Sequence, residues 1–188
     1  MRNPIRHLAV GLVLLMASGC AKRSAESAVA AAEKAVGKVE AEASKVSPIE
    51  LKAVVDSIAA MKGHIAAGDY RAALMGARSA SSMVRDLESG IATRKEQLTN
   101  SFNALSAELP KQMASVTSKV AELAAMRRLP AGMDPAMVAG LKTETGGWQA
   151  AWDGATKAFA DGNLADALTQ ARAISDKVTA AMTRLGLS

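Results

Sequence analysis

Residues 68–78 read GDYRAALMGAR, and residues 162–172 read GNLADALTQAR. Both stretches fit the pattern G-[DN]-[YL]-x-x-A-L-x-x-A-R, and they lie 94 residues apart. Glycine readily adopts the left-handed conformation that ends a helix, and Asp or Asn caps the helix that follows. Each stretch therefore predicts a tight turn that leads into a helix.

The correspondence extends without a gap in both directions, so that Ile58 pairs with Trp152. Further pairs at the same offset are Ile65 with Phe159 and Val84 with Val178. Small residues that would let two helices approach closely also recur, at Ala73, Ala77, Ala167 and Ala171. The residues of about 51–91 and 145–185 are therefore predicted to form two helix-turn-helix hairpins related by internal duplication.

The composition favours helix throughout the chain. About one residue in five is alanine, only 3% are aromatic, and no alternating strand pattern of useful length occurs. The formal net charge is +5, with acidic and basic residues interleaved. Because no cluster of Lys and Arg stands out, the sequence gives no indication of a nucleic-acid partner.

Prolines and glycines mark the expected helix boundaries outside the hairpin turns. Ser47-Pro48 and Asp134-Pro135 each place an N-cap residue before a proline, and they predict helices that run to about residues 67 and 161. Gly146-Gly147 is an expected bend in the second of these helices.

A long apolar stripe runs through residues 84–128, between the two hairpins. Pro110 lacks a backbone donor and clashes with the preceding turn, so a kink or break is expected near residues 107–110. The predicted fold is therefore all-α: an elongated helical bundle of two hairpins joined by a long kinked helical segment and preceded by an Ala-rich helix.

The turn and second helix of each hairpin resemble the tetratricopeptide repeat, in which the pattern G-x-[YF]-x-x-A is common. Gly68, Tyr70 and Ala73 match that pattern, as do Gly162 and Ala167. Ser57 and Ala151 stand where the repeat favours Trp, and the spacing is 94 residues instead of 34. The resemblance therefore implies hairpin geometry and does not extend to a peptide-binding groove.

The Ala-rich segment 24–46 places small apolar residues at a 4-3-4-3 spacing, which is typical of a coiled-coil seam. One interpretation is a self-associating stalk. The other is an amphipathic linker helix that docks on the bundle or remains separate. The expected organisation is thus an N-terminal signal segment 1–19, a stalk or linker 20–47, and a helical bundle domain 48–188.

The first 20 residues have the layout of a secretory signal. Arg2 and Arg6 precede a short apolar run, Leu8 to Ala17, which is about half the length that a spanning helix requires. The stretch Ala17-Ser18-Gly19-Cys20 then resembles the lipobox of bacterial lipoproteins. Cys20 is the only cysteine, so an internal disulfide is excluded.

The lipobox resemblance implies cleavage before Cys20 and attachment of acyl chains to this residue. The mature chain would then hold 169 of the 188 residues, and loss of Arg2 and Arg6 would lower the charge from +5 to +3. Ala21 follows Cys20 in place of the Asp that favours retention at the inner membrane in this family. The resemblance therefore implies an outer-membrane lipoprotein that faces the periplasm.

No catalytic, cofactor or metal site is expected in the mature chain. His64 is its one histidine, and no second His, Cys or acidic cluster complements it. Trp148 and Trp152 lie four residues apart and have two interpretations, as core packing or as a partner contact together with Tyr70. Small-molecule substrates are not indicated.

These features together predict a non-enzymatic, membrane-anchored envelope protein that serves as a helical interaction or structural module. An envelope protein or a second copy of the chain is the expected partner. The alternative is a membrane- or lipid-interacting protein that acts through the amphipathic segment 24–46.

Overall fold

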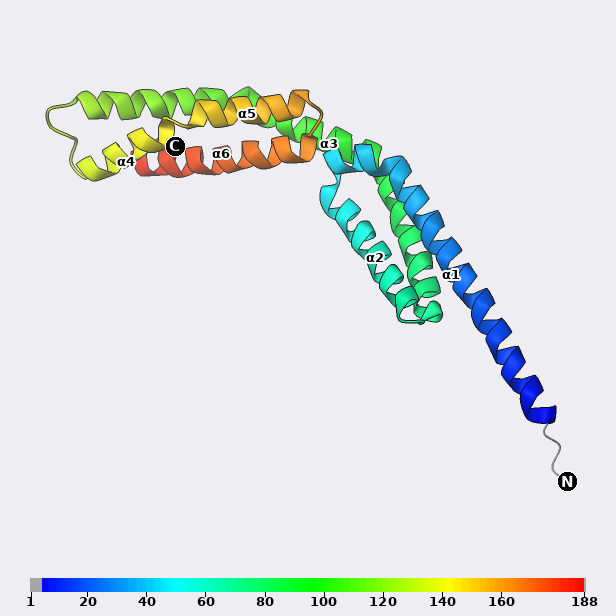
Figure 1. The fold of residues 1–188 in the computed structure, drawn as a ribbon. Helices are drawn as coiled ribbons and strands as arrows, with labels where there is room; N and C mark the ends of the chain where they lie inside the picture. Colours follow the sequence, from blue (N-terminus) through cyan, green and yellow to red (C-terminus); the bar gives the residue numbers. More distant parts are fainter. Residues whose placement is uncertain (1–4, 188) are drawn as a thin grey trace. The chain divides into compact units, whose positions relative to one another are not determined.

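The computed structural model describes residues 5–187 and gives side-chain positions from Cys20 to Leu187 (Figure 1). The predicted signal segment 1–19 therefore lies outside the described side chains. The described chain contains helices and turns and no strand, which confirms the all-α prediction. The helices are α1 (Ile5–Val46), α2 (Pro48–Ala66), α3 (Tyr70–Ala125), α4 (Pro135–Thr145), α5 (Trp148–Ala160) and α6 (Leu164–Leu185).

The chain divides into two compact units between Ile91 and Ala92. The first unit contains α1, α2 and the part of α3 up to Ile91. The second unit contains the rest of α3 together with α4, α5 and α6. Each predicted hairpin thus packs with the helical segments that precede it in the sequence. These are α1 in the first unit, and the rest of α3 together with α4 in the second unit.

The core of the first unit consists of small and medium-sized aliphatic side chains and one methionine. Its α1 contribution is the seam of segment 24–46, whose members are all buried: Ala25, Val29, Ala32, Val36, Val39, Ala43 and Val46. Val54, Ile58 and Met61 of α2 join most of these side chains in one cluster, with Ala77, Ala80, Val84 and Leu87 of α3. Segment 24–46 therefore docks within its own chain, which was one of the two interpretations of its seam.

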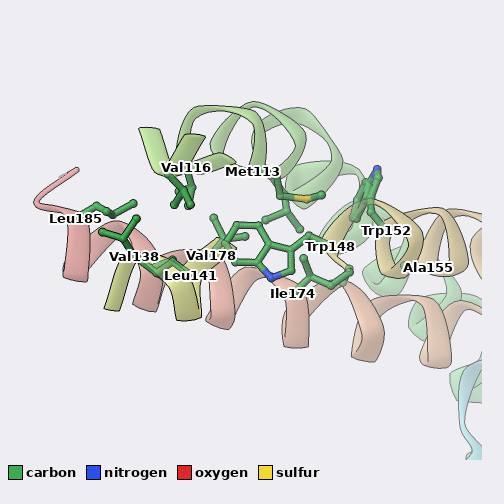
Figure 2. Close-up of a cluster of buried hydrophobic side chains, with 14 of the residues drawn as sticks. Met113, Val116, Val138, Leu141, Trp148, Trp152, Ala155, Ile174, Val178 and Leu185 are labelled. Carbon is green, nitrogen blue, oxygen red and sulfur yellow. The ribbon is translucent and has the colours of Figure 1, made fainter. Parts of the chain in front are cut away.

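The core of the second unit is larger and contains both tryptophans and both phenylalanines of the chain (Figure 2). Phe102 of α3 stacks on two rings of α5, with centroid distances of 5.6 Å to Trp152 and 4.3 Å to Phe159. Val116, Val138, Leu141 and Val178 extend the same cluster toward the far end of α6, at Leu185. All four helical segments of this unit contribute to one continuous core.

In each unit, an ion pair joins two neighbouring helices. Lys62 of α2 pairs with Glu33 of α1 in the first unit. Arg184 of α6 pairs with Glu144 of α4 in the second unit, at 3.1 Å. These pairs are largely exposed to solvent, so their contribution to stability is small compared with that of the apolar cores.

The two hairpin turns are the same structure, repeated at the offset of 94 residues. The Asp69 N–H donates to the His64 carbonyl at 2.8 Å, and the Asn163 N–H donates to the Ala158 carbonyl at 2.9 Å. Gly68 and Gly162 adopt φ angles of +78° and +79°. Both turns are therefore Schellman motifs, in which a left-handed glycine ends the helix.

Of the other predicted helix caps, one was confirmed and two were not. Asp134 caps α4 through a hydrogen bond from the Ala136 N–H at 2.9 Å, as expected. Ser47 and Asn163 occupy N-cap positions, but neither side chain accepts a capping hydrogen bond. The sequence predicted their place at the helix start, and the expected side-chain cap is absent there.

Pro110 does not break α3, which continues from Tyr70 to Ala125 with the proline inside it. The neighbouring Leu109 and Met113 are both buried in the core of the second unit. A proline in a helix interior costs about 3 kcal/mol, and burial of two large apolar side chains offsets a cost of that size. Of the kink or break predicted near residues 107–110, the break does not occur, because tertiary packing outweighs the local penalty.

Candidate lipid-attachment site and its surroundings

Cys20 is exposed, and its thiol is free. It lies within α1, immediately before the segment that packs into the first unit. An accessible sulfur at this place can carry a substituent without disturbing the core. The position therefore suits covalent attachment of a bulky group.

A groove of about 440 Å³ lies beside Cys20, on the surface of the first unit. Its lining consists of Ala21 from α1 and Tyr70, Arg71, Leu74, Met75 and Arg78 from α3. Met75 is 62% exposed. The groove combines apolar walls with two arginines on one helix face.

Sequence reasoning found Tyr70 and did not find the rest of this surface. Arg71, Leu74, Met75 and Arg78 follow the spacing i, i+3, i+4, i+7 of a single helix face. The buried residues of the same helix, such as Ala73 and Ala77, form the neighbouring face. This second periodic stripe, beside the stripe of buried residues, is the sequence signal that could have identified the surface.

Trp148 and Trp152 lie in the core of the second unit, with exposed fractions of 4% and 7% (Figure 2). Their burial corresponds to the packing interpretation of this pair. The Trp148 Nε1–H group is buried and has no hydrogen-bond partner. Tyr70 differs from both tryptophans because it belongs to the first unit and is half-buried at the groove.

The second unit has a pocket of about 530 Å³ where the loop after α3 meets α4. Leu123, Met126, Leu129, Met133 and Val138 provide apolar walls, and Arg127 and Lys142 add positive charge.

The described residues contain no group of three or more His, Cys, Asp and Glu side chains placed to hold a metal ion. His64 is exposed near the end of α2. None of the helices in the described part of the chain has the length and apolar character needed to cross a membrane.

Comparisons with protein-family models, with curated proteins and with solved structures found no match to this chain.

Proposed function

We propose that this chain is a bacterial envelope lipoprotein, anchored through acyl chains on Cys20, whose two helical units act as a non-enzymatic interaction or structural module. The observation that carries the proposal is the single cysteine of the sequence, which follows a signal-like segment and the stretch Ala17-Ser18-Gly19. Its exposed position just before the buried seam of α1 supports this assignment. Two or more acyl chains would form a durable membrane anchor.

The duplicated architecture supports an interaction or structural role. Each unit buries its own apolar core, and the turns are held by the same hydrogen bonds. Such units offer stable helix faces to a partner. We propose the periplasmic face of the outer membrane as the compartment, since Ala21 follows the acylated residue.

The alternative function, membrane binding by segment 24–46, has less support. That segment would need its apolar seam free to enter a bilayer. The seam is instead buried against α2 and α3 in the first unit. Membrane insertion of this face would require the first unit to open.

Mass spectrometry of the protein purified from bacterial envelopes tests the anchor directly. The expected mature chain begins at Cys20 and carries the added mass of acyl chains. The variant Cys20→Ser should remain unprocessed and unacylated, while Ser24→Ala is a matched control that should be processed normally. A wild-type chain that starts at another residue, or that carries no acyl mass, would contradict the proposal.

Crosslinking in intact cells tests the interaction role. One stoichiometric protein partner would identify the chain as an adaptor subunit, whereas crosslinks only between copies of the chain would indicate a self-associating structural protein. Isolation of the protein without either kind of crosslink would contradict the interaction role.

A further inference from the structure

The first two turns of α3 carry a surface stripe that the fold of the first unit does not use. Met75 is 62% exposed, and Tyr70 and Leu74 are half-buried beside it. The buried face of these turns, represented by Ala73 and Ala77, already supplies the contacts to the core. Among the side chains that the structure describes, from Cys20 to Leu187, the stripe is therefore free to contact something outside the chain.

The stripe also carries two positive charges that are not paired with a described acid. Arg71 and Arg78 flank Leu74 and Met75, and both are exposed. Neither arginine forms an ion pair within the part of the chain that the structure describes. The nearby Asp69 is engaged with the Ala72 N–H at 3.0 Å.

The start of α1 adds to the same charge. Lys22 and Arg23 come two and three residues after Cys20, and Glu26 is the one acid in residues 21–26. Glu26 lies 3.9 Å from Lys22 and compensates one cation. The surroundings of Cys20 therefore hold an excess of exposed cations next to an apolar groove.

We propose that this groove and its two arginines form a membrane-contact surface that takes anionic phospholipid headgroups. The inference rests on the proposed acylation of Cys20, and it names the part of the folded unit that meets the bilayer. Ala21 lines the groove and is the next residue after Cys20, so the groove would lie at the membrane surface whenever the anchor is inserted.

The residue types suit this role. Arginine side chains bind phosphate groups through several N–H donors, and their aliphatic stems tolerate an apolar surface. Tyrosine is enriched at the boundary between bilayer and water, and methionine is a flexible apolar side chain. The combination of a lipid anchor with a basic surface is a common way to strengthen attachment to anionic membranes.

The test uses the full acylated protein reconstituted into vesicles. Acylation blocks Cys20, so the variant Met75→Cys offers one free thiol for an environment-sensitive fluorophore. The matched control is Ile49→Cys, which is 81% exposed and lies at the opposite end of α2 from the turn before α3. Lipids that carry a quencher then report which probe contacts the bilayer.

The expected result is strong quenching at residue 75 and weak quenching at residue 49 in vesicles that contain phosphatidylglycerol. The double variant Arg71→Gln/Arg78→Gln should weaken the contact equilibrium by about fivefold for each arginine lost. Replacement of Arg172 and Lys177, two exposed cations of the second unit, by Gln makes the same charge change and should leave the quenching at residue 75 unchanged.

Equal quenching of the two probes on acylated, vesicle-bound protein would overturn the inference and leave the proposed function intact. Quenching at residue 75 that is the same in neutral and anionic vesicles would also overturn it, because the headgroup charge would then have no role. A purified chain without acyl mass would instead overturn the proposed function, and the inference with it.

Discussion

The two units share one turn and differ in the core that the turn brings together. At four pairs of equivalent positions, the side chain is large in one unit and smaller in the other. These pairs are Val54 and Trp148, Met61 and Ala155, Ala80 and Ile174, and Leu87 and Ala181. The two units thus place their large core side chains at different positions. The turn and the small alanines that follow it are the same in both.

This comparison separates what defines the hairpin from what fills it. The left-handed glycine and the buried Ala73 and Ala167 occur in both units, so they set the backbone geometry. The remaining core positions tolerate exchange provided that the combined volume still fills the space. The predictions below use equivalent positions in the two units as matched controls.

The largest effect is expected for Trp148→Ala, which removes a buried indole from the second unit. Truncation of a buried Trp costs about 3–5 kcal/mol of stability, whereas the equivalent Val54→Ala removes only two methyl groups and should cost less. Denaturant unfolding followed by tryptophan fluorescence measures the effect, because both tryptophans belong to the second unit and Trp152 remains as a probe.

Val54→Ala is the control for that experiment, and it should leave the fluorescence-detected transition unchanged while lowering the stability detected by circular dichroism. If Val54→Ala shifts the fluorescence transition as strongly as Trp148→Ala does, the two cores do not unfold as separate units.

Trp148→Phe sharpens the same comparison. It removes the Nε1–H group that has no partner, and an unsatisfied buried donor costs about 1–3 kcal/mol. It also leaves a small void, which acts in the opposite direction. We expect a net change much smaller than that of Trp148→Ala in the same unfolding experiment, and an equal loss for both variants would refute this account.

The turns should respond equally in the two units. Gly68→Ala and Gly162→Ala each place a Cβ atom on a residue with φ near +79°, and a non-glycine residue in this region costs about 1–2 kcal/mol. Thermal unfolding followed by circular dichroism should show a similar loss for both variants. A loss confined to one variant would mean that the turns are not equivalent.

Gly76 should behave unlike the other helical glycines. A Cβ atom at this residue would lie 2.8 Å from Cγ of the buried Met61, so Gly76→Ala should destabilise by about 1 kcal/mol even though alanine favours helix. Gly90→Ala meets no atom within 4 Å and should stabilise the same helix. Both changes are measured as shifts in the midpoint of denaturant unfolding.

The second unit indicates how that clash is avoided. The equivalents of Met61 and Gly76 are Ala155 and Gln170, so the larger side chain has moved to the facing helix. In a Met61→Ala background, Gly76→Ala should therefore become stabilising. A double-mutant cycle that finds no coupling between residues 61 and 76 would contradict the view that Met61 is what excludes a side chain at residue 76.

Much of this fold follows from local signals in the sequence. The glycines at 68 and 162 and the aspartate at 134 act through their own backbone and nearest neighbours, so their roles were predicted correctly. The apolar stripe of segment 24–46 also predicted its buried face. Its partner was left open, because a periodic stripe shows that a face is buried and does not show against what.

Long-range packing accounts for the parts that were missed. Pro110 stays inside α3 because Leu109 and Met113 are buried on either side of it. The groove beside Cys20 depends on the approach of Ala21 to α3 across about 50 residues of sequence. Neither relation has a local signature, so neither could be predicted from helix propensity or capping patterns.

The smallest expected difference concerns the residue that follows each left-handed glycine. Asp69 and Asn163 are equivalent in sequence, and both were predicted to cap the next helix. The Asp69 carboxylate accepts a hydrogen bond from the Ala72 N–H at 3.0 Å, whereas Asn163 forms no side-chain cap.

Loss of a capping side chain costs about 1 kcal/mol, so Asp69→Ala should lower stability by that amount and Asn163→Ala by much less. Thermal unfolding of the two variants under one buffer condition measures this difference. Equal losses would show that the amide of Asn163 caps α6 in solution, and the two turns would then be equivalent in their side chains as well as in their backbones.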